Sequence, residues 1–186
     1  AAYPGLTRLS SIGKSVQGRD LWVMKISDNP GIEEDEPEVG YIAAMHGDEV
    51  VGKEMSFNLI DHLTANYGTD PRVTSLVDDL EIWILPSMNP DGTALNRRYN
   101  ANFVDLNRDF PDQFNDPVDT TAGRAIETAH VMNWGRARSR SLSANFHGGA
   151  IVANYPWDGT PTGASTYSRC PDDSAFVSLS HSQNAN

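Results

Sequence analysis

Short apolar runs alternate with longer amphipathic segments along this chain. Runs rich in β-branched and aromatic residues predict strands, and they occupy residues 21–27, 39–45, 81–87, 141–146 and 150–156. Apolar residues recur at helical spacing in two other segments, residues 50–67 and 123–139. This alternation predicts an α/β fold, with a mixed, mostly parallel twisted sheet flanked by helices.

One long segment, residues 89–117, lacks a convincing period and is rich in Asn, Asp, Arg and Pro. A compact domain retains so long an irregular segment mainly when the segment is functional. We therefore expect residues 89–117 to line a site.

Polar residues follow three of the predicted strands at the points where these strands end. They are His46, Asn89 and His147. Ligands of open α/β sheets bind outside the carboxyl ends of the strands. We therefore expect these three residues to converge on one site.

The stretch "HGDE" places His46 and Glu49 three residues apart, just before a predicted helix. Alone, this spacing also fits polar residues at a solvated helix start. With His147 as a third candidate, two imidazoles and one carboxylate suit Zn²⁺ and leave a position for water, as in catalytic zinc sites. We expect one Zn²⁺ per chain. Three other histidines lack a ligand partner at suitable spacing and are interpreted as surface or packed residues: His62, His130 and His181.

Composition narrows the class of protein. The chain has 186 residues, of which 39% are hydrophobic, and this suits one compact domain over residues 1–186. A net charge of −11 argues against a nucleic-acid partner and makes a basic substrate worth considering. No run of 18 apolar residues predicts a membrane span, and the start "AAYPGL" lacks the features of a signal peptide. The single Cys170 is either a free thiol or half of a bridge.

Four motifs resemble the zinc metallocarboxypeptidases, and among them carboxypeptidases N, E, D and M. They are "MHGDEVVGKE", "PSMNPDG", "RRYNANFVDLNRDFPDQF" and "LSANFHGGAIVANYPWD". The resemblance implies a zinc exopeptidase, secreted or periplasmic, that acts on the C-termini of peptides or proteins. It implies His46, Glu49 and His147 as the zinc ligands.

The resemblance also implies roles for residues of the 89–117 segment. Asp105 would accept the other ring N–H of His46, and Arg98 would polarise the scissile carbonyl. Asn107 and Arg108 would hold the terminal carboxylate of the substrate, because a guanidinium fork matches a carboxylate. The alternatives are an Asx-type turn at Asp105 and surface solubility for the arginines.

The motif "NYPWD" implies a specificity pocket. Asp158 would lie at its base and favour a C-terminal Lys or Arg, and Tyr155 is expected to contact the substrate. The alternative is that Asp158 begins the exposed "DGTPTG" turn. The resemblance further implies cis peptide bonds at Gly148–Gly149 and Pro156–Trp157.

The general base of the family, a Glu, and its substrate-capping Tyr lie beyond the last motif found here, and no Glu follows Glu127. We therefore expect an incomplete peptidase domain that lacks its C-terminal part and is inactive by itself. A missing C-terminal segment of the same domain would be its partner. The alternative is a catalytically silent module that binds zinc and peptide carboxylates.

Overall fold

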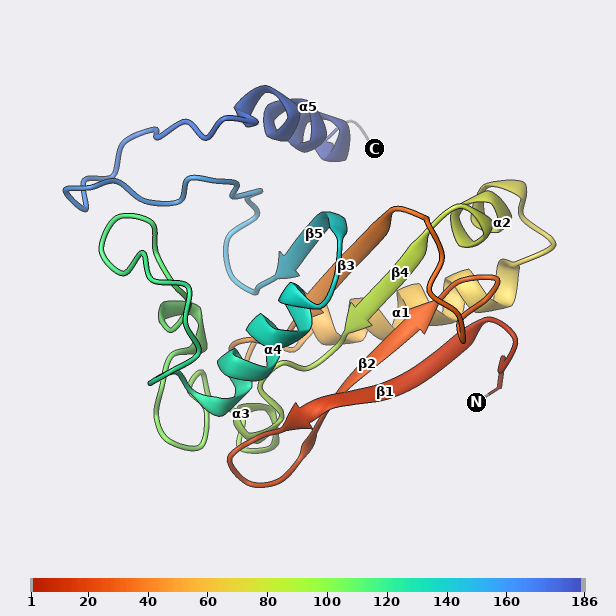
Figure 1. Cartoon of the computed structure of the whole chain (residues 1–186), viewed down its shortest axis with the longest axis horizontal. Helices are drawn as coiled ribbons and strands as arrows, with labels where there is room; N and C mark the ends of the chain where they lie inside the picture. Colours follow the sequence, from red (N-terminus) through yellow and green to blue (C-terminus); the bar gives the residue numbers. More distant parts are fainter. Residues whose placement is uncertain (1, 185–186) are drawn as a thin grey trace. The chain divides into compact units, whose positions relative to one another are not determined.

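The computed structural model describes residues 2–184 (Figure 1). The chain divides into two compact units, which we name unit 1 (Ala1–Phe110 with Thr121–Gly148) and unit 2 (Pro111–Thr120 with Gly149–Asn186). The two units are described separately below. A single domain over residues 1–186 stays a prediction.

Unit 1 is built on a five-stranded sheet with the order β1-β2-β4-β3-β5. The strands are β1 (Thr7–Lys14), β2 (Asp20–Ile26), β3 (Glu38–Ala43), β4 (Glu81–Leu85) and β5 (Arg140–Phe146). The β1–β2 and β2–β4 pairs are antiparallel, and the β3–β4 and β3–β5 pairs are parallel. The predicted mixed α/β sheet is confirmed. Parallel and antiparallel neighbours are equally frequent because β1, which the sequence pattern does not predict, joins as a hairpin.

Helices cover both faces of this sheet. Figure 1 shows α4 (Ile126–Arg136) in front of the strands and α1 (Val51–Asn66) behind them. The short α2 (Pro71–Asp78) packs with α1. Its start is stabilised by Asp70, whose side chain accepts the Arg72 and Val73 N–H groups.

Strand β4 separates two hydrophobic cores. Its side chains alternate between the faces: Ile82 and Ile84 join the α1 and α2 core, while Trp83 and Leu85 join the α4 core. All five residues of β4 are buried. A strand buried on both faces appears in the sequence as the continuous apolar run from which β4 was predicted.

A buried carboxylate ties the β1–β2 turn to α3 (Pro90–Ala94). Asp91 accepts hydrogen bonds from Ser15 Oγ at 2.8 Å, the Gln17 N–H at 2.9 Å and Arg19 Nη1 at 2.6 Å. Burial alone would raise the pKa of Asp91, but these donors hold it below its ordinary value. Asp91 therefore anchors α3 on the side that faces the hairpin.

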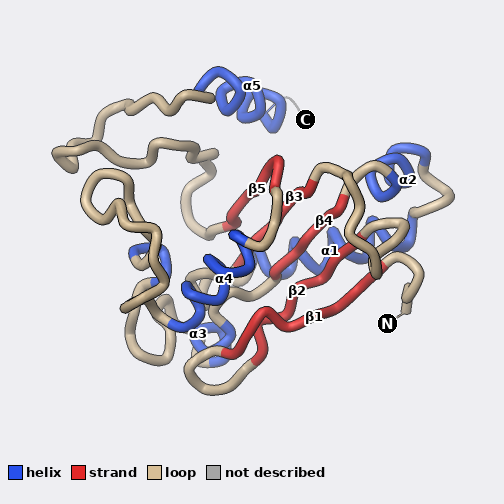
Figure 2. Tube along the Cα trace, viewed as in Figure 1, coloured by secondary structure: helices blue, strands red, loops and turns tan. Residues whose placement is uncertain are grey.

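Unit 2 contains α5 (Asp173–Asn184), which the sequence pattern does not predict. Figure 2 shows loop throughout between β5 and α5, so the predicted strand at residues 150–156 is wrong. Ile151 and Val152 are exposed there. A short apolar run forms a strand only when a neighbouring strand pairs with it, and within the described residues β5 pairs only with β3.

Two further expectations concern peptide bonds that follow β5. The Pro156–Trp157 bond is cis as predicted, and it is the single cis bond in residues 2–184, so the prediction for Gly148–Gly149 is wrong. Glycine tolerates a positive φ, and Gly149 bends the chain through φ +100° with a trans bond.

Cys170 is a buried free thiol. None of the described helices is long and apolar enough to cross a membrane.

Candidate metal centre

Two parallel strands deliver the histidines to one edge of the sheet. β3 ends at Ala43 beside Phe146, the last residue of β5. His147 follows β5 directly, and His46 lies in the short loop that leads from β3 to α1. Because the carboxyl ends of parallel neighbours share an edge, segments 101 residues apart in sequence bring these two imidazoles together.

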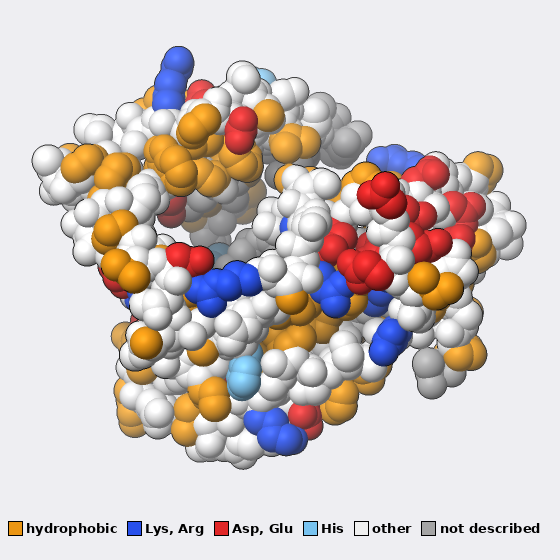
Figure 3. Space-filling view, viewed as in Figure 1, with side chains coloured by type: hydrophobic (Ala, Val, Ile, Leu, Met, Phe, Trp, Pro, Cys, Tyr) orange, Lys and Arg blue, Asp and Glu red, His pale blue; other side chains and the backbone are white. Residues whose placement is uncertain are grey.

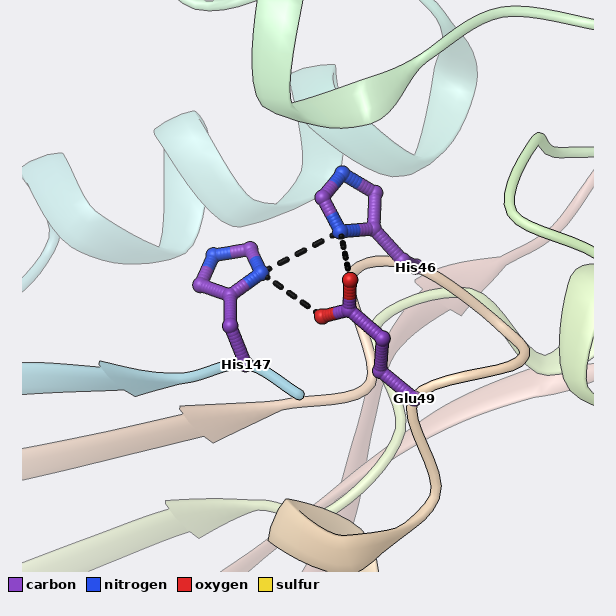
Figure 4. A group of neighbouring side chains, drawn as sticks. All are labelled: His46, Glu49 and His147. Carbon is purple, nitrogen blue, oxygen red and sulfur yellow. Dashed lines mark hydrogen bonds and ion pairs between the residues drawn. The ribbon is translucent and has the colours of Figure 1, made fainter. Parts of the chain in front are cut away.

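The side chains of His46, Glu49 and His147 point toward one another (Figure 4). Glu49 lies between the imidazoles: Oε1 is 2.9 Å from His46 Nδ1, and Oε2 is 2.9 Å from His147 Nδ1. The two Nδ1 atoms are 3.2 Å apart. One face of the group is open, since the side chain of His147 is 31% exposed and that of His46 is 3% exposed.

This geometry fits a zinc ion. Ligand atoms about 2.1 Å from a tetrahedral zinc lie about 3.4 Å from one another, and the three donor atoms here all lie within 4.8 Å. Two imidazole nitrogens and a carboxylate are donors that zinc accepts. The residues present could therefore hold Zn²⁺ with a position left on the exposed side.

Asp105 contacts His46 at Nε2, the ring nitrogen that does not face Glu49. Its Oδ1 is 3.1 Å from His46 Nε2, so the carboxylate accepts that ring N–H and leaves Nδ1 facing the centre. Arg98 donates from Nε to Asp105 Oδ2 at 2.9 Å. Burial alone would raise the pKa of Asp105, but Arg98, the Asn107 N–H and His46 lower it.

The Arg98 guanidinium also borders the centre itself. Its Nη1 lies 3.6 Å from Glu49 Oε1 and 3.3 Å from His46 Nδ1. The side chain remains 36% exposed, so one part is held by Asp105 and another faces solvent. A fixed cation therefore stands beside Glu49 and His46.

Glu49 is held as a carboxylate. Burial opposes its charged form, but the Gly148 N–H, His147 and His46 outweigh burial and lower its pKa. The Gly148 N–H donates to Oε2 at 2.9 Å, and a Cβ on Gly148 would stand 3.2 Å from Glu49 Cγ. Glycine lets the backbone approach this closely.

Two other carboxylate groups in the described residues have only oxygen donors. One is formed by Asp28, Glu34 and Glu36, and the other by Glu33, Glu38 and Glu81. Acidic side chains gather near α2 on the face drawn in Figure 3. The second group is bonded to basic residues, because Lys25 pairs with Glu81 and Arg138 with Glu33. Neither group has the nitrogen donors that favour zinc.

The clamp candidates follow Asp105 on the 3-10 turn η1 (Leu106–Arg108). The Asn107 N–H donates to Asp105 Oδ1 at 3.0 Å. Arg108 is exposed, and in the described residues its guanidinium donates to the Asn107 carbonyl and meets no carboxylate. Its charge is available to a ligand.

The pocket candidates belong to unit 2. Asp158 is exposed, and the ring of Tyr155 stacks on that of Phe176 with centroids 6.0 Å apart. Their roles stay predictions.

Asn89 and the remaining histidines supply no donor atom to the ligand group of the described residues. Asn89 is fully buried and hydrogen-bonds to the carbonyls of Met45 and Arg98, so it lies next to the centre, as expected, without being a ligand. His62 and His181 are exposed, and His130 is half-buried on α4. Within the part of the chain that the structure describes, none belongs to a potential metal group.

The sequence profile of the zinc carboxypeptidase family matches residues 1–186. This chain belongs to that family. Zinc is therefore its cofactor. A match over the whole sequence places both units within one family pattern.

Relatives of this zinc carboxypeptidase chain are similar over nearly all of its length. Carboxypeptidase D of Mus musculus is 51% identical over 97% of this chain, and the match spans 14% of that protein. Carboxypeptidase M of Mus musculus is 43% identical over 96% of this chain and matches along 43% of its own length. The chain thus spans less than half of either relative.

Solved structures agree on the fold. The crystal structure of thrombin activatable fibrinolysis inhibitor matches with a TM-score of 0.80, covering 97% of this chain and 50% of that one. At 18% identity this match supports the architecture alone.

Proposed function

We propose that this chain forms the metal- and carboxylate-binding part of a zinc-dependent exopeptidase that removes C-terminal Lys or Arg from peptides. The observation that carries the proposal is the convergence of His46, Glu49 and His147, with Asp105 and Arg98 attached to them. When bound, zinc supplies Lewis acidity at this position.

Arg98 is the proposed carbonyl-polarising group. Its guanidinium is fixed by Asp105 and borders the ligand group at Glu49 Oε1. Donors that are already oriented stabilise developing negative charge without further reorganisation. We assign Arg98 to the carbonyl oxygen of the scissile bond.

Arg108 and Asn107 are the proposed clamp for the substrate's terminal carboxylate. The exposed Arg108 guanidinium contacts no carboxylate of the described chain, and its planar fork can donate two hydrogen bonds to one carboxylate. Capture of a free carboxylate restricts cleavage to the last residue of a peptide, which defines an exopeptidase.

We expect residues 1–186 to lack the general base that peptide hydrolysis needs. The carboxylates that contact the two histidines in the described chain are Glu49 and Asp105, and both already hold imidazoles. Positioned acid–base catalysis contributes about 10²- to 10⁴-fold. Residues 1–186 alone should therefore turn over a peptide ending in Arg near background, whereas the full-length gene product should be active.

The assay compares both polypeptides before and after chelation and after zinc is restored. Activity of the full-length product that chelation does not affect would contradict the zinc exopeptidase. Zinc binding without turnover by the full-length product would favour the silent binding module. Robust zinc-dependent turnover by residues 1–186 would show that a residue of this chain acts as the base.

Substrate preference is expected to depend on Asp158. Asp158→Ala in the full-length enzyme removes one charged partner, so kcat/KM for a peptide ending in Arg should fall about 10- to 100-fold. The value for a matched peptide ending in Leu should change little. Arg108→Ala is the contrasting variant, because loss of the clamp should weaken both peptides alike. An unchanged Arg-to-Leu ratio in Asp158→Ala would assign this residue to the turn instead.

A further inference from the structure

Asn89 lies where three backbone segments around the metal centre meet. Its buried Nδ2 donates to the Met45 carbonyl at 3.3 Å and to the Arg98 carbonyl at 3.2 Å. Its Oδ1 accepts the Gly92 N–H at 2.8 Å, at the start of α3. A single amide thus joins the loop that carries His46, the backbone of Arg98 and α3.

The hydrogen bond from Asn89 to Met45 continues a series of hydrogen bonds between the two segments that follow β3 and β4. The Met88 N–H donates to the Ala43 carbonyl at 2.9 Å, and the Asn89 N–H donates to the Ala44 carbonyl at 3.1 Å. Between these contacts Ala44 adopts φ +49°, in the left-handed region that costs a non-glycine residue energy. Such a conformation persists only where neighbours enforce it. The Asn89 side chain donates to the next carbonyl, that of Met45, which directly precedes His46.

The same loop packs on α3 without intervening side chains. A Cβ on Gly47 would stand 2.1 Å from the Gly92 carbonyl carbon. The Gly47 N–H donates to the Arg98 carbonyl at 3.3 Å, so this oxygen accepts from both Gly47 and Asn89. Any slip of the loop against Arg98 must break these bonds.

Resting on the function proposed above, we propose that Asn89 is a positioning residue that sets the separation of His46 from Arg98. It touches neither substrate nor metal and acts through the Met45 and Arg98 carbonyls. Asparagine suits the task, since its amide supplies two donors and an acceptor at one position. Aspartate has the same shape but, ionised, cannot donate. Serine can still accept the Gly92 N–H as a helix cap, but it is too short to bridge both carbonyls.

The test uses Asn89→Ser and Asn89→Asp in the full-length protein, with Asp91→Asn as the matched control. Asp91 is equally buried in the same helix, but it bonds to the β1–β2 turn rather than to the metal loop. Three quantities are measured below the Tm of each variant: the zinc dissociation constant by chelator competition, kcat with KM, and amide hydrogen exchange at Gly47 in metal-free protein.

Both Asn89 variants should weaken zinc binding about 10-fold and lower kcat about 10- to 100-fold with KM nearly unchanged. Exchange at Gly47 should accelerate about 5- to 10-fold. Asp91→Asn should lower Tm while leaving these three quantities within about twofold of the unaltered protein. Should Asn89→Asp fail to fold, Asn89→Ser decides, since it keeps the cap.

Two results would overturn the inference: Asn89 variants that lose only Tm, or an Asp91 variant that loses as much kcat as they do. The exchange measurement needs no metal, so it tests positioning even if the zinc exopeptidase proves wrong. Absence of zinc from the unaltered protein would instead contradict the proposed function. The hydrogen-exchange rate at Gly47 would then decide whether Asn89 positions the loop.

Discussion

Replacing His147 with alanine is expected to abolish stoichiometric zinc binding by the full-length protein. The side chain supplies one of three donor atoms, and Glu49 Oε2 would lose its imidazole neighbour at 2.9 Å. Removing a residue that merely orients a ligand commonly costs 10- to 100-fold in metal affinity. Loss of a ligand should therefore weaken binding by at least about 100-fold, and peptidase activity should fall to background.

Metal analysis after dialysis against chelator-free buffer measures this directly. His62→Ala is the control, because His62 is exposed on α1 and contacts Asn66 rather than the centre. It should retain one zinc per chain. Unchanged zinc content in His147→Ala, or zinc bound elsewhere, would refute the ligand assignment.

Replacing Arg98 with glutamine is expected to lower kcat about 10²- to 10³-fold in the full-length enzyme. Loss of one donor to a developing oxyanion has this magnitude elsewhere. Glutamine keeps polarity and much of the length, but it removes the charge beside Glu49 and the pair with Asp105. KM should change much less, because the interaction strengthens as charge develops on the carbonyl oxygen.

The adjacent Arg97 provides a control with the same substitution. Arg97 donates to the Asn100 carbonyl and lies over the Phe103 ring, so it stabilises the loop rather than the centre. Arg97→Gln should leave kcat within about threefold. If the two variants lose kcat equally, the register that assigns the catalytic role to Arg98 is wrong. If Arg98→Gln raises KM alone, this residue binds substrate without stabilising the transition state.

Local periodicity identified most elements of unit 1. The segments predicted at 39–45 and 50–67 correspond to β3 at Glu38–Ala43 and α1 at Val51–Asn66. Such patterns suffice because each element buries one stripe or face whose period is set by backbone geometry. The failure at residues 150–156 has the complementary cause: a local apolar run does not specify the neighbour with which a strand pairs.

The candidate zinc group was also accessible from sequence. His46, Glu49 and His147 carry side chains whose chemistry suits zinc, and the ends of two predicted strands lie beside them. Asn89 was singled out by the same argument, but its contacts with three backbone segments were not predicted. An amide buried against three backbone segments has no local signature, since its partners are carbonyls and an N–H that every residue possesses.

The sequence by itself determined most element types of unit 1, the donor set and membership of the zinc carboxypeptidase family, because each depends on residue identity at short spacing. Only the tertiary structure decided that β4 lies between β2 and β3, and that Asp105 and Arg98 reach His46 across 59 and 52 residues. It also showed that the Asn89 amide bonds to Met45, Arg98 and Gly92. These are contacts between distant segments, and their energies depend on burial and hydrogen-bond geometry that arise only when the sheet has assembled.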